Sequence, residues 1–225
     1  MRSRLLFFVL VGLGFVHSLS AQKTSEVGLF AGLAAYQGDL APSPFDIEEV
    51  NFSTGAVFRH MFNPKLALKV NAFYAKLSGT DNRDLGRIER GATMNSNLLE
   101  FAANFEYHPL GRSRYANSGF FNRQFSPYIG VGLGLALSNY ELKGLPLIQQ
   151  EEKKSAFLVT PVTLGLRLDM TKAVTVTLDI GSRPAWSDNL EGISKNGFSN
   201  NKDWYLIGGM TVLYVIDAEA GRFGF

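Results

Sequence analysis

The sequence predicts an all-β fold: an eight-stranded antiparallel transmembrane β-barrel preceded by a cleaved signal peptide. Three observations support this prediction. An apolar stretch follows basic residues at the start of the chain, eight later segments alternate between apolar and polar residues, and one face of each segment is nearly free of charge. The hydrophobic content of 46% is too low for a bundle of membrane helices, whereas strands with one apolar and one polar face readily produce it.

Residues 1–21 have the composition of a signal peptide. Basic residues precede an apolar run over residues 5–16, and small residues follow it. This run is shorter than the roughly 20 apolar residues that a membrane-spanning helix needs. We therefore expect cleavage after Ala21 or after Ser20, which leaves residues 22–225 as the outer-membrane barrel domain. An N-terminal membrane anchor is the alternative.

The first four predicted strands each have one apolar face. They cover residues 26–36, 52–62, 66–77 and 97–107. Their outward faces carry Val27, Leu29 and Leu33; Phe52, Phe58 and Phe62; Leu68, Val70 and Tyr74; and Leu99, Phe101 and Phe105. The opposite faces mix small, polar and charged residues, which is the alternation expected of a membrane-barrel strand.

The last four predicted strands cover residues 128–140, 156–168, 174–183 and 204–216. Their outward faces carry Ile129, Val131 and Leu133; Leu158, Leu164 and Leu166; Val176, Leu178 and Ile180; and Met210, Val212 and Tyr214. Pro161 weakens the strand 156–168, because proline cannot donate to a strand ladder. The end of the last strand resembles the terminal signal that barrel-assembly machinery reads, so this machinery is an expected partner.

The predicted connections alternate in length. The links 63–65 and 169–172 are short, and the links 37–51, 79–96, 141–155 and 184–203 are long and polar. Outer-membrane barrels have short periplasmic turns and long outer loops, so the long links are predicted outside the cell. The link 108–127 is the exception: it is long yet predicted on the periplasmic side. Its Arg112, Arg114 and Arg123 are predicted to contact a periplasmic partner, with merely solvated arginines as the alternative.

A soluble β-sandwich or lipocalin-like barrel would show the same alternation with the opposite burial. Inward faces rich in glycine and charge would make a poor soluble core, and the outward faces are nearly free of charge. Aromatic residues at strand ends suit a membrane-interface girdle: Tyr36, Tyr74, Tyr107, Tyr128, Trp204 and Tyr214. These features favour a barrel in the cell outer membrane, with lipid as its surroundings.

The lumen of an eight-stranded barrel is just wide enough for side chains to fill it. Unpaired buried charges are costly, so the inward-facing charges are expected to pair with one another. These residues are Glu26, Arg59, Lys69, Glu100, Glu106, Arg167, Asp179 and Arg183. The sequence therefore predicts a plugged, ion-paired interior, with a narrow polar pore as the alternative.

The sequence offers little for catalysis or nucleic-acid binding. His60 and His108 are predicted beside turns, as interface or solvent residues, and neither a Gly-x-Ser-x-Gly nor a His-Glu-x-x-His motif occurs. The absence of cysteine excludes a thiolate metal site and a disulfide framework. Without Arg2 and Arg4 of the leader, 20 basic and 20 acidic residues balance. We expect no enzyme, no metal site, no cofactor and no nucleic-acid partner.

Two short segments resemble a known family. Residues 36–40 read Tyr-Gln-Gly-Asp-Leu and residues 126–132 read Ser-Pro-Tyr-Ile-Gly-Val-Gly. With the leader and the strand spacing, they resemble the PorG-like outer-membrane proteins of Bacteroidetes, which are β-barrel components of the type IX secretion system. The resemblance covers nearly the whole mature chain and carries over no catalytic residues.

This resemblance implies a structural or accessory role in protein secretion. The expected partners are the proteins of a periplasmic secretion ring, formed in that family by a lipoprotein and its partner. The alternative is a general small outer-membrane protein of adhesin or narrow-porin type that acts through its extracellular loops. An enzyme that acts on lipid A is a more distant third hypothesis.

Overall fold

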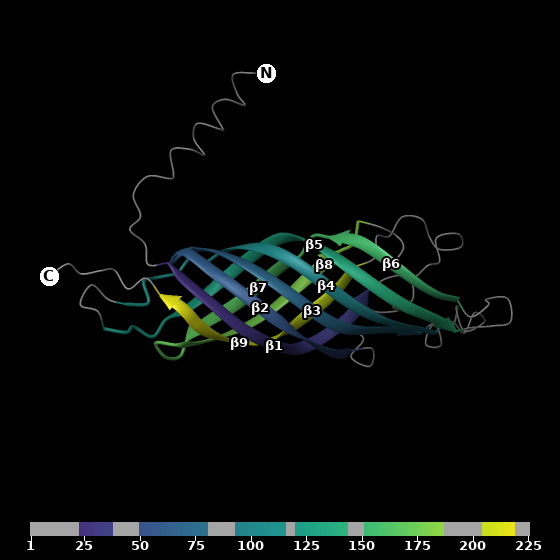
Figure 1. Ribbon diagram of the computed structural model, residues 1–225, viewed down its shortest axis with the longest axis horizontal. Coiled ribbons are helices and arrows are strands. Elements are labelled where there is room, and N and C mark those ends of the chain that lie inside the picture. The colour runs from purple at the N-terminus through teal and green to yellow at the C-terminus, as the bar shows by residue number, and fades with distance from the viewer. Residues whose placement is uncertain are drawn as a thin grey trace, which may run out of the picture.

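The computed structural model describes residues 23–37, 50–80, 93–115, 120–143, 151–186 and 204–218, which form an antiparallel β-barrel (Figure 1). The described strands are β1 (Thr24–Gln37), β2 (Asn51–Asn63), β3 (Leu66–Thr80), β4 (Thr93–Tyr107), β5 (Phe125–Lys143), β6 (Glu151–Val159), β7 (Val162–Asp169), β8 (Val174–Pro184) and β9 (Trp204–Ala218). Their order in the sheet is β4-β3-β2-β1-β9-β8-β7-β5-β6, and β4 also pairs with β5, so the wall is closed. The predicted leader and its cleavage site lie outside the described residues.

The predicted eight-stranded barrel is confirmed, with one predicted strand broken in two. The strand predicted over 156–168 is split into β6 and β7 at Thr160 and Pro161, and both halves pair with β5. Proline has no N–H to donate, so the ladder cannot run through it. Its carbonyl still accepts a hydrogen bond from the Gly132 N–H at 3.0 Å, which keeps the break against the wall.

The hairpins at one end of the barrel extend further than predicted. β3 and β4 pair as far as Thr80 and Thr93, and β5 and β6 pair as far as Leu142 and Glu151. The links predicted over 79–96 and 141–155 therefore begin and end inside strands. Polar residues can hold these extensions together because the pairing there is made by backbone hydrogen bonds. Residues 38–49, 81–92, 144–150 and 187–203 of the four long links lie outside the described residues.

Burial is inverted relative to a soluble β-sandwich. Leu29, Phe105 and Leu133 point outward with 73%, 65% and 63% of their surfaces exposed, whereas Glu26 and Arg59 point inward at 0%. An apolar exterior around a charged interior belongs to a β-barrel that spans the bacterial outer membrane, where lipid covers the apolar face. The soluble alternative is wrong for this chain. Among the described residues, no helix is long and apolar enough to cross a membrane.

The two ends of the barrel differ, and we name them by their connections. The turn end carries the links 64–65, 108–124 and 170–173, and the loop end is the opposite one, where β3–β4 and β5–β6 extend (Figure 1). Since short turns face the periplasm in outer-membrane barrels, the turn end is the periplasmic end.

The lumen has an apolar half that the sequence reasoning missed. Toward the loop end it is filled by Ala34, Ala75, Leu77, Leu98, Ala136, Phe157, Tyr205 and Ile207, all buried. Phe30 and Phe73 stack next to this cluster, with ring centroids 4.5 Å apart. These side chains lie inside the lumen, where lipid cannot reach them, so they gain by packing against one another.

The position of the Tyr128 ring depends on a glycine, Gly165, on the neighbouring strand. Tyr128 pairs with Gly165 on the neighbouring strand, and a Cβ at Gly165 would lie 2.3 Å from Cζ of the tyrosine ring. The ring therefore lies over a bare backbone, an arrangement that helps a small barrel to curve. This contact brings the tyrosine into the charged part of the lumen, where it is buried, so its predicted place in the membrane-interface girdle is wrong.

Leu133→Arg tests the membrane placement of the wall. An arginine on the lipid-facing side of β5 is expected to lower the free energy of unfolding by about 2–4 kcal/mol, because the charge must enter hydrocarbon. The measurement is a denaturant titration of the barrel folded into phospholipid vesicles. Leu110→Arg, at an equally exposed residue of the 108–124 link, is the control and should change stability by about 0.5 kcal/mol or less. Equal effects of the two substitutions would contradict the placement.

Candidate functional site

The strongest concentration of chemistry lies in the lumen. Within the described residues, five carboxylates and five Lys or Arg side chains are buried there, so the formal charges cancel. The carboxylates are Glu26, Glu100, Glu106, Asp169 and Asp179, and the cations are Arg59, Lys69, Arg114, Arg167 and Arg183. All eight residues predicted for the lumen are among them. Asp169, predicted in a tight turn, and Arg114, predicted at a partner contact, are the two that the sequence reasoning did not place there.

Glu26 is the meeting point of three guanidinium groups. Its Oε1 accepts from Arg167 Nη2 at 2.6 Å and from Arg114 Nη1 at 3.2 Å, and its Oε2 lies 3.9 Å from Arg59 Nη1. The three arginines come from β7, from the link after β4 and from β2. Because guanidinium groups remain charged in proteins, one carboxylate on β1 ties three distant parts of the chain together.

Asp169 supplies a second carboxylate to the same group. Its Oδ1 accepts from Arg167 Nε at 3.0 Å and from Arg114 Nη2 at 3.2 Å. The Thr175 hydroxyl lies between the two acids, 3.1 Å from Glu26 Oε1 and 2.9 Å from Asp169 Oδ1. These contacts close the turn end of the lumen with charge-assisted hydrogen bonds, which are stronger than neutral ones.

A second cluster surrounds Glu106, further around the wall. Arg59 Nε lies 2.8 Å from Glu106 Oε2, and Lys69 Nζ lies 3.3 Å from its Oε1. Lys69 Nζ also lies 3.6 Å from Asp179 Oδ2, which accepts the Tyr128 hydroxyl at 2.8 Å. Arg59 therefore links the Glu26 and Glu106 clusters, and the tyrosine ring lies within cation–π distance of both cations.

Glu100 forms a third cluster, next to the apolar half. Its Oε2 accepts from the Tyr205 hydroxyl at 2.6 Å and lies 3.3 Å from Arg183 Nε. Its Oε1 accepts from Asn71 Nδ2 at 3.2 Å, and Asn104 in turn donates to Asn71. From the turn end toward the loop end, the lumen thus contains the ion pairs around Glu26 and Glu106, then the amides, then the Glu100–Arg183 pair beside the apolar side chains. This filling is typical of a plugged barrel and unlike an open pore.

His108 differs from its prediction as a solvent or interface residue, because the structure buries it completely. Its ring lies 4.9 Å from the Tyr128 ring, and Nε2 lies 3.5 Å from Glu106 Oε2. Burial lowers the pKa of His108 below its usual value and outweighs the opposite effect of Glu106. His60 stays partly exposed on the wall and shares a 3.0 Å hydrogen bond with Ser25.

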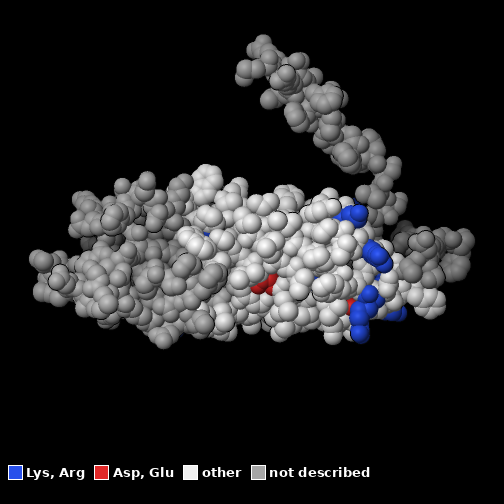
Figure 2. Space-filling model, turned by 180° about the vertical axis from the view of Figure 1, so that it is seen from behind, with Lys and Arg blue, Asp and Glu red and all other residues white. Residues whose placement is uncertain are grey.

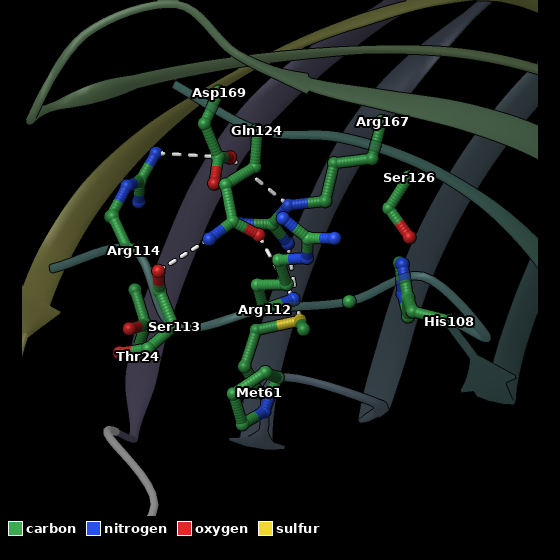
Figure 3. A pocket seen from close by; sticks show the side chains of 12 residues that line it. Thr24, Met61, His108, Arg112, Ser113, Arg114, Gln124, Ser126, Arg167 and Asp169 are labelled. Carbon is green, nitrogen blue, oxygen red and sulfur yellow. Dashed lines mark hydrogen bonds and ion pairs between the residues drawn. The ribbon is translucent and has the colours of Figure 1, made fainter. Parts of the chain in front are cut away.

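The link 108–124 is folded over the turn end, and we call its described residues, 108–115 and 120–124, the cap (Figure 3). The His108 N–H donates to the Lys65 carbonyl at 2.8 Å, and the Asp169 N–H donates to the Gln124 carbonyl at 2.9 Å. A Cβ at Gly111 would lie 1.8 Å from the Pro64 carbonyl oxygen, so only glycine fits this approach. The cap is therefore tied to both neighbouring turns.

Arg114 anchors the cap in the lumen and is not available for the predicted partner contact. Its side chain is 5% exposed, and its guanidinium lies 3.2 Å from Glu26 Oε1. It also reaches Asp169 at 3.2 Å (Figure 3). These two carboxylates neutralise a charge that would otherwise be buried without a counter-ion. Arg112 and Arg123 of the cap are exposed. Beneath the cap, a cavity of about 30 Å³ is large enough for a single water molecule.

A family model described as Domain of unknown function (DUF6089) matches residues 3–221 of the chain. A comparison with curated proteins gave no match.

Several solved structures are similar. A major outer membrane protein from Thermus thermophilus has 14% identity and a TM-score of 0.47, with 85% of this chain and 99% of that one covered. Neisserial surface protein A has 12% identity and a TM-score of 0.44, with 87% and 97% covered. Ail, the attachment invasion locus protein of Yersinia pestis, has 9% identity and a TM-score of 0.43, with 88% and 99% covered.

Glu26→Gln tests the central position of this carboxylate. Removing its charge leaves three guanidinium groups short of a counter-ion, so the free energy of unfolding should fall by about 3–5 kcal/mol. Denaturant titration in vesicles measures it. The variant E26Q/R167Q restores the charge balance and should lose less than the sum of the two single variants. Strictly additive losses would show that the two side chains do not depend on each other.

Arg114→Met tests the anchoring of the cap. Trypsin can cleave at the exposed Arg112 and Arg123, but only when the cap leaves the turn end. The substitution should speed this cleavage about ten-fold or more, because cap opening no longer breaks two buried ion pairs. Lys65→Met alters an exposed residue of the neighbouring turn and serves as the control. Cleavage of R114M at the wild-type rate would mean that the ion pairs do not hold the cap.

Proposed function

The chain belongs to the family described as Domain of unknown function (DUF6089), and we propose that it is an accessory outer-membrane barrel of a type IX-like protein secretion system. Its turn end would meet a periplasmic partner of that system. The resemblance of residues 36–40 and 126–132 to PorG-like proteins supports this proposal. The barrel itself is a general outer-membrane architecture, so the specific role depends on its surfaces.

The observation that carries the proposal is the combination of a filled lumen with a folded cap. Ion pairs fill the turn-end half of the lumen and apolar side chains fill the loop-end half. Such an interior favours a function at the ends of the barrel over conduction through it. The narrow-porin alternative receives no support from the described part of the lumen.

The outer side of the cap has the composition of a protein contact. Phe120 and Leu110 are 75% and 60% exposed, and the exposed Arg112 and Arg123 lie on the same segment. Aromatic residues and arginine are enriched at protein interfaces. Because Arg114 fixes the cap from within, a partner would meet a surface that is already ordered and would lose little entropy on binding.

One observation favours the second candidate, an adhesin-type role at the loop end. The β5–β6 pairing continues to Leu142 and Glu151, whereas β8 ends at Pro184, so this hairpin projects past its neighbour. A projecting pair of strands presents backbone and side chains to molecules outside the cell.

The variant R112E/R123E tests the secretion role in cells. Reversing two exposed charges should reduce co-purification of periplasmic ring proteins and export of secreted cargo, each by about ten-fold, because like charges then face the partner. The buried Arg114 is untouched, so the barrel should still show the heat-dependent gel mobility of a folded barrel. Lys76→Glu, at an exposed lysine toward the loop end, is the matched control.

Wild-type export and co-purification in folded R112E/R123E would contradict the proposed contact. In that case, loss of adhesion to host or surface material after shortening the β5–β6 hairpin would support the second candidate. The two roles thus make opposite predictions for opposite ends of one barrel.

A further inference from the structure

Exposed charge in the described chain is concentrated at the turn end. Lys23, Lys65, Arg112, Arg123 and Lys172 are exposed there, and we call these five residues the basic rim. Figure 2 shows Lys and Arg gathered at one end of the barrel beside a surface that is otherwise almost free of charge. Every acidic side chain whose burial the structure describes lies inside the lumen. The rim therefore has no described exposed carboxylate to balance it.

The basic rim runs around the barrel. Lys23 precedes β1, Lys65 lies in the turn between β2 and β3, and Lys172 lies in the turn between β7 and β8. Arg112 and Arg123 belong to the cap between β4 and β5. Each connection described at the turn end thus contributes at least one cation. The headgroup layer of a membrane surrounds the whole circumference of the barrel, so it can reach a cation on each of these segments.

The rim also lies at the depth where headgroups are expected. Tyr107, Phe125 and Tyr214 lie near the turn-end ends of their strands with 48%, 57% and 58% of their surfaces exposed. Exposed aromatic residues of a membrane barrel mark the boundary between hydrocarbon and headgroups. Lysine and arginine just beyond that boundary can lay their stems along the apolar wall and place their charges among phosphates.

We propose that the three lysines of the basic rim, Lys23, Lys65 and Lys172, bind the phosphate groups of anionic phospholipids in the membrane leaflet at the turn end. Lysine ammonium groups act as point charges toward phosphate and need no fixed geometry, which suits a fluid layer. The proposal goes beyond the secretion role and does not depend on it. The phosphate is that of phospholipid, because the phosphates of lipid A belong to the opposite leaflet.

The test uses the triple variant K23Q/K65Q/K172Q, which leaves both cap arginines in place. The full mature barrel in uncharged detergent is titrated with phosphatidylglycerol, phosphatidylcholine or lipid A, and bound lipid is counted by native mass spectrometry. Wild-type protein should prefer phosphatidylglycerol to phosphatidylcholine. The variant should bind phosphatidylglycerol about 100-fold more weakly, at roughly five-fold per lost charge near a headgroup surface. K76Q, toward the loop end, should bind like wild type.

Salt provides a second measurement that needs no variant. Raising the ionic strength screens exposed charges, so wild-type preference for phosphatidylglycerol should disappear near about 1 M salt. Equal wild-type affinity for the two phospholipids would overturn the proposal, as would unchanged binding by the triple variant. Loss of lipid A binding alone in the variant would assign the rim to the other source of phosphate and would also overturn it. Failure of the R112E/R123E experiment on secretion would leave this result unaffected.

Discussion

The neutralisation of charge inside a narrow lumen is the constraint on which the structure depends. Glu26 on β1 has no route to water, so its carboxylate must be satisfied by the guanidinium groups of Arg59, Arg114 and Arg167. Those groups can meet it only if the wall is closed and the cap is folded down. One ionised group thereby connects the barrel wall, the turn end and the filling of the lumen.

The lumen and the membrane stabilise different side chains of this protein. Lipid covers the leucine and phenylalanine side chains outside, so the interior is free to hold charges that a soluble core would exclude. The apolar cluster around Leu77, Leu98 and Ile207 then fills the remaining part, and the Glu100–Arg183 ion pair lies at its boundary. The result is a solid barrel with two chemically different ends, and both proposed interaction surfaces lie at the end that the ion pairs close.

Much of the fold could be predicted because strand alternation is local. A period of two fixes which side chains share a face, so Glu100 and Glu106 were placed inside from their neighbours alone. The position of Arg114 could not be found this way, because its partner Glu26 is 88 residues distant and an irregular link brings them together. His108 lies in the same irregular link, where strand alternation no longer applies, so its burial could not be predicted either. The predicted strands 66–77 and 97–107 are too short at the loop end, because alternation is lost at polar residues such as Asn95. Asn95 still pairs with Ser78 through the backbone, which does not require hydrophobic side chains.

The ion-pair network also has a consequence for how the barrel is built. Arg167 and Glu26 are 141 residues apart, and their strands join one sheet through β8, β9 and the β1–β9 seam. Until that seam forms, the neighbouring strand β2 offers Glu26 only the 3.9 Å contact with Arg59, and Arg167 has only Asp169 on its own strand. Both charges then lack their shortest contact, and incompletely paired charges are costly in hydrocarbon. Partly assembled sheets are therefore unfavourable in the bilayer. Joining the first strand to the last is the step that makes insertion complete and hard to reverse.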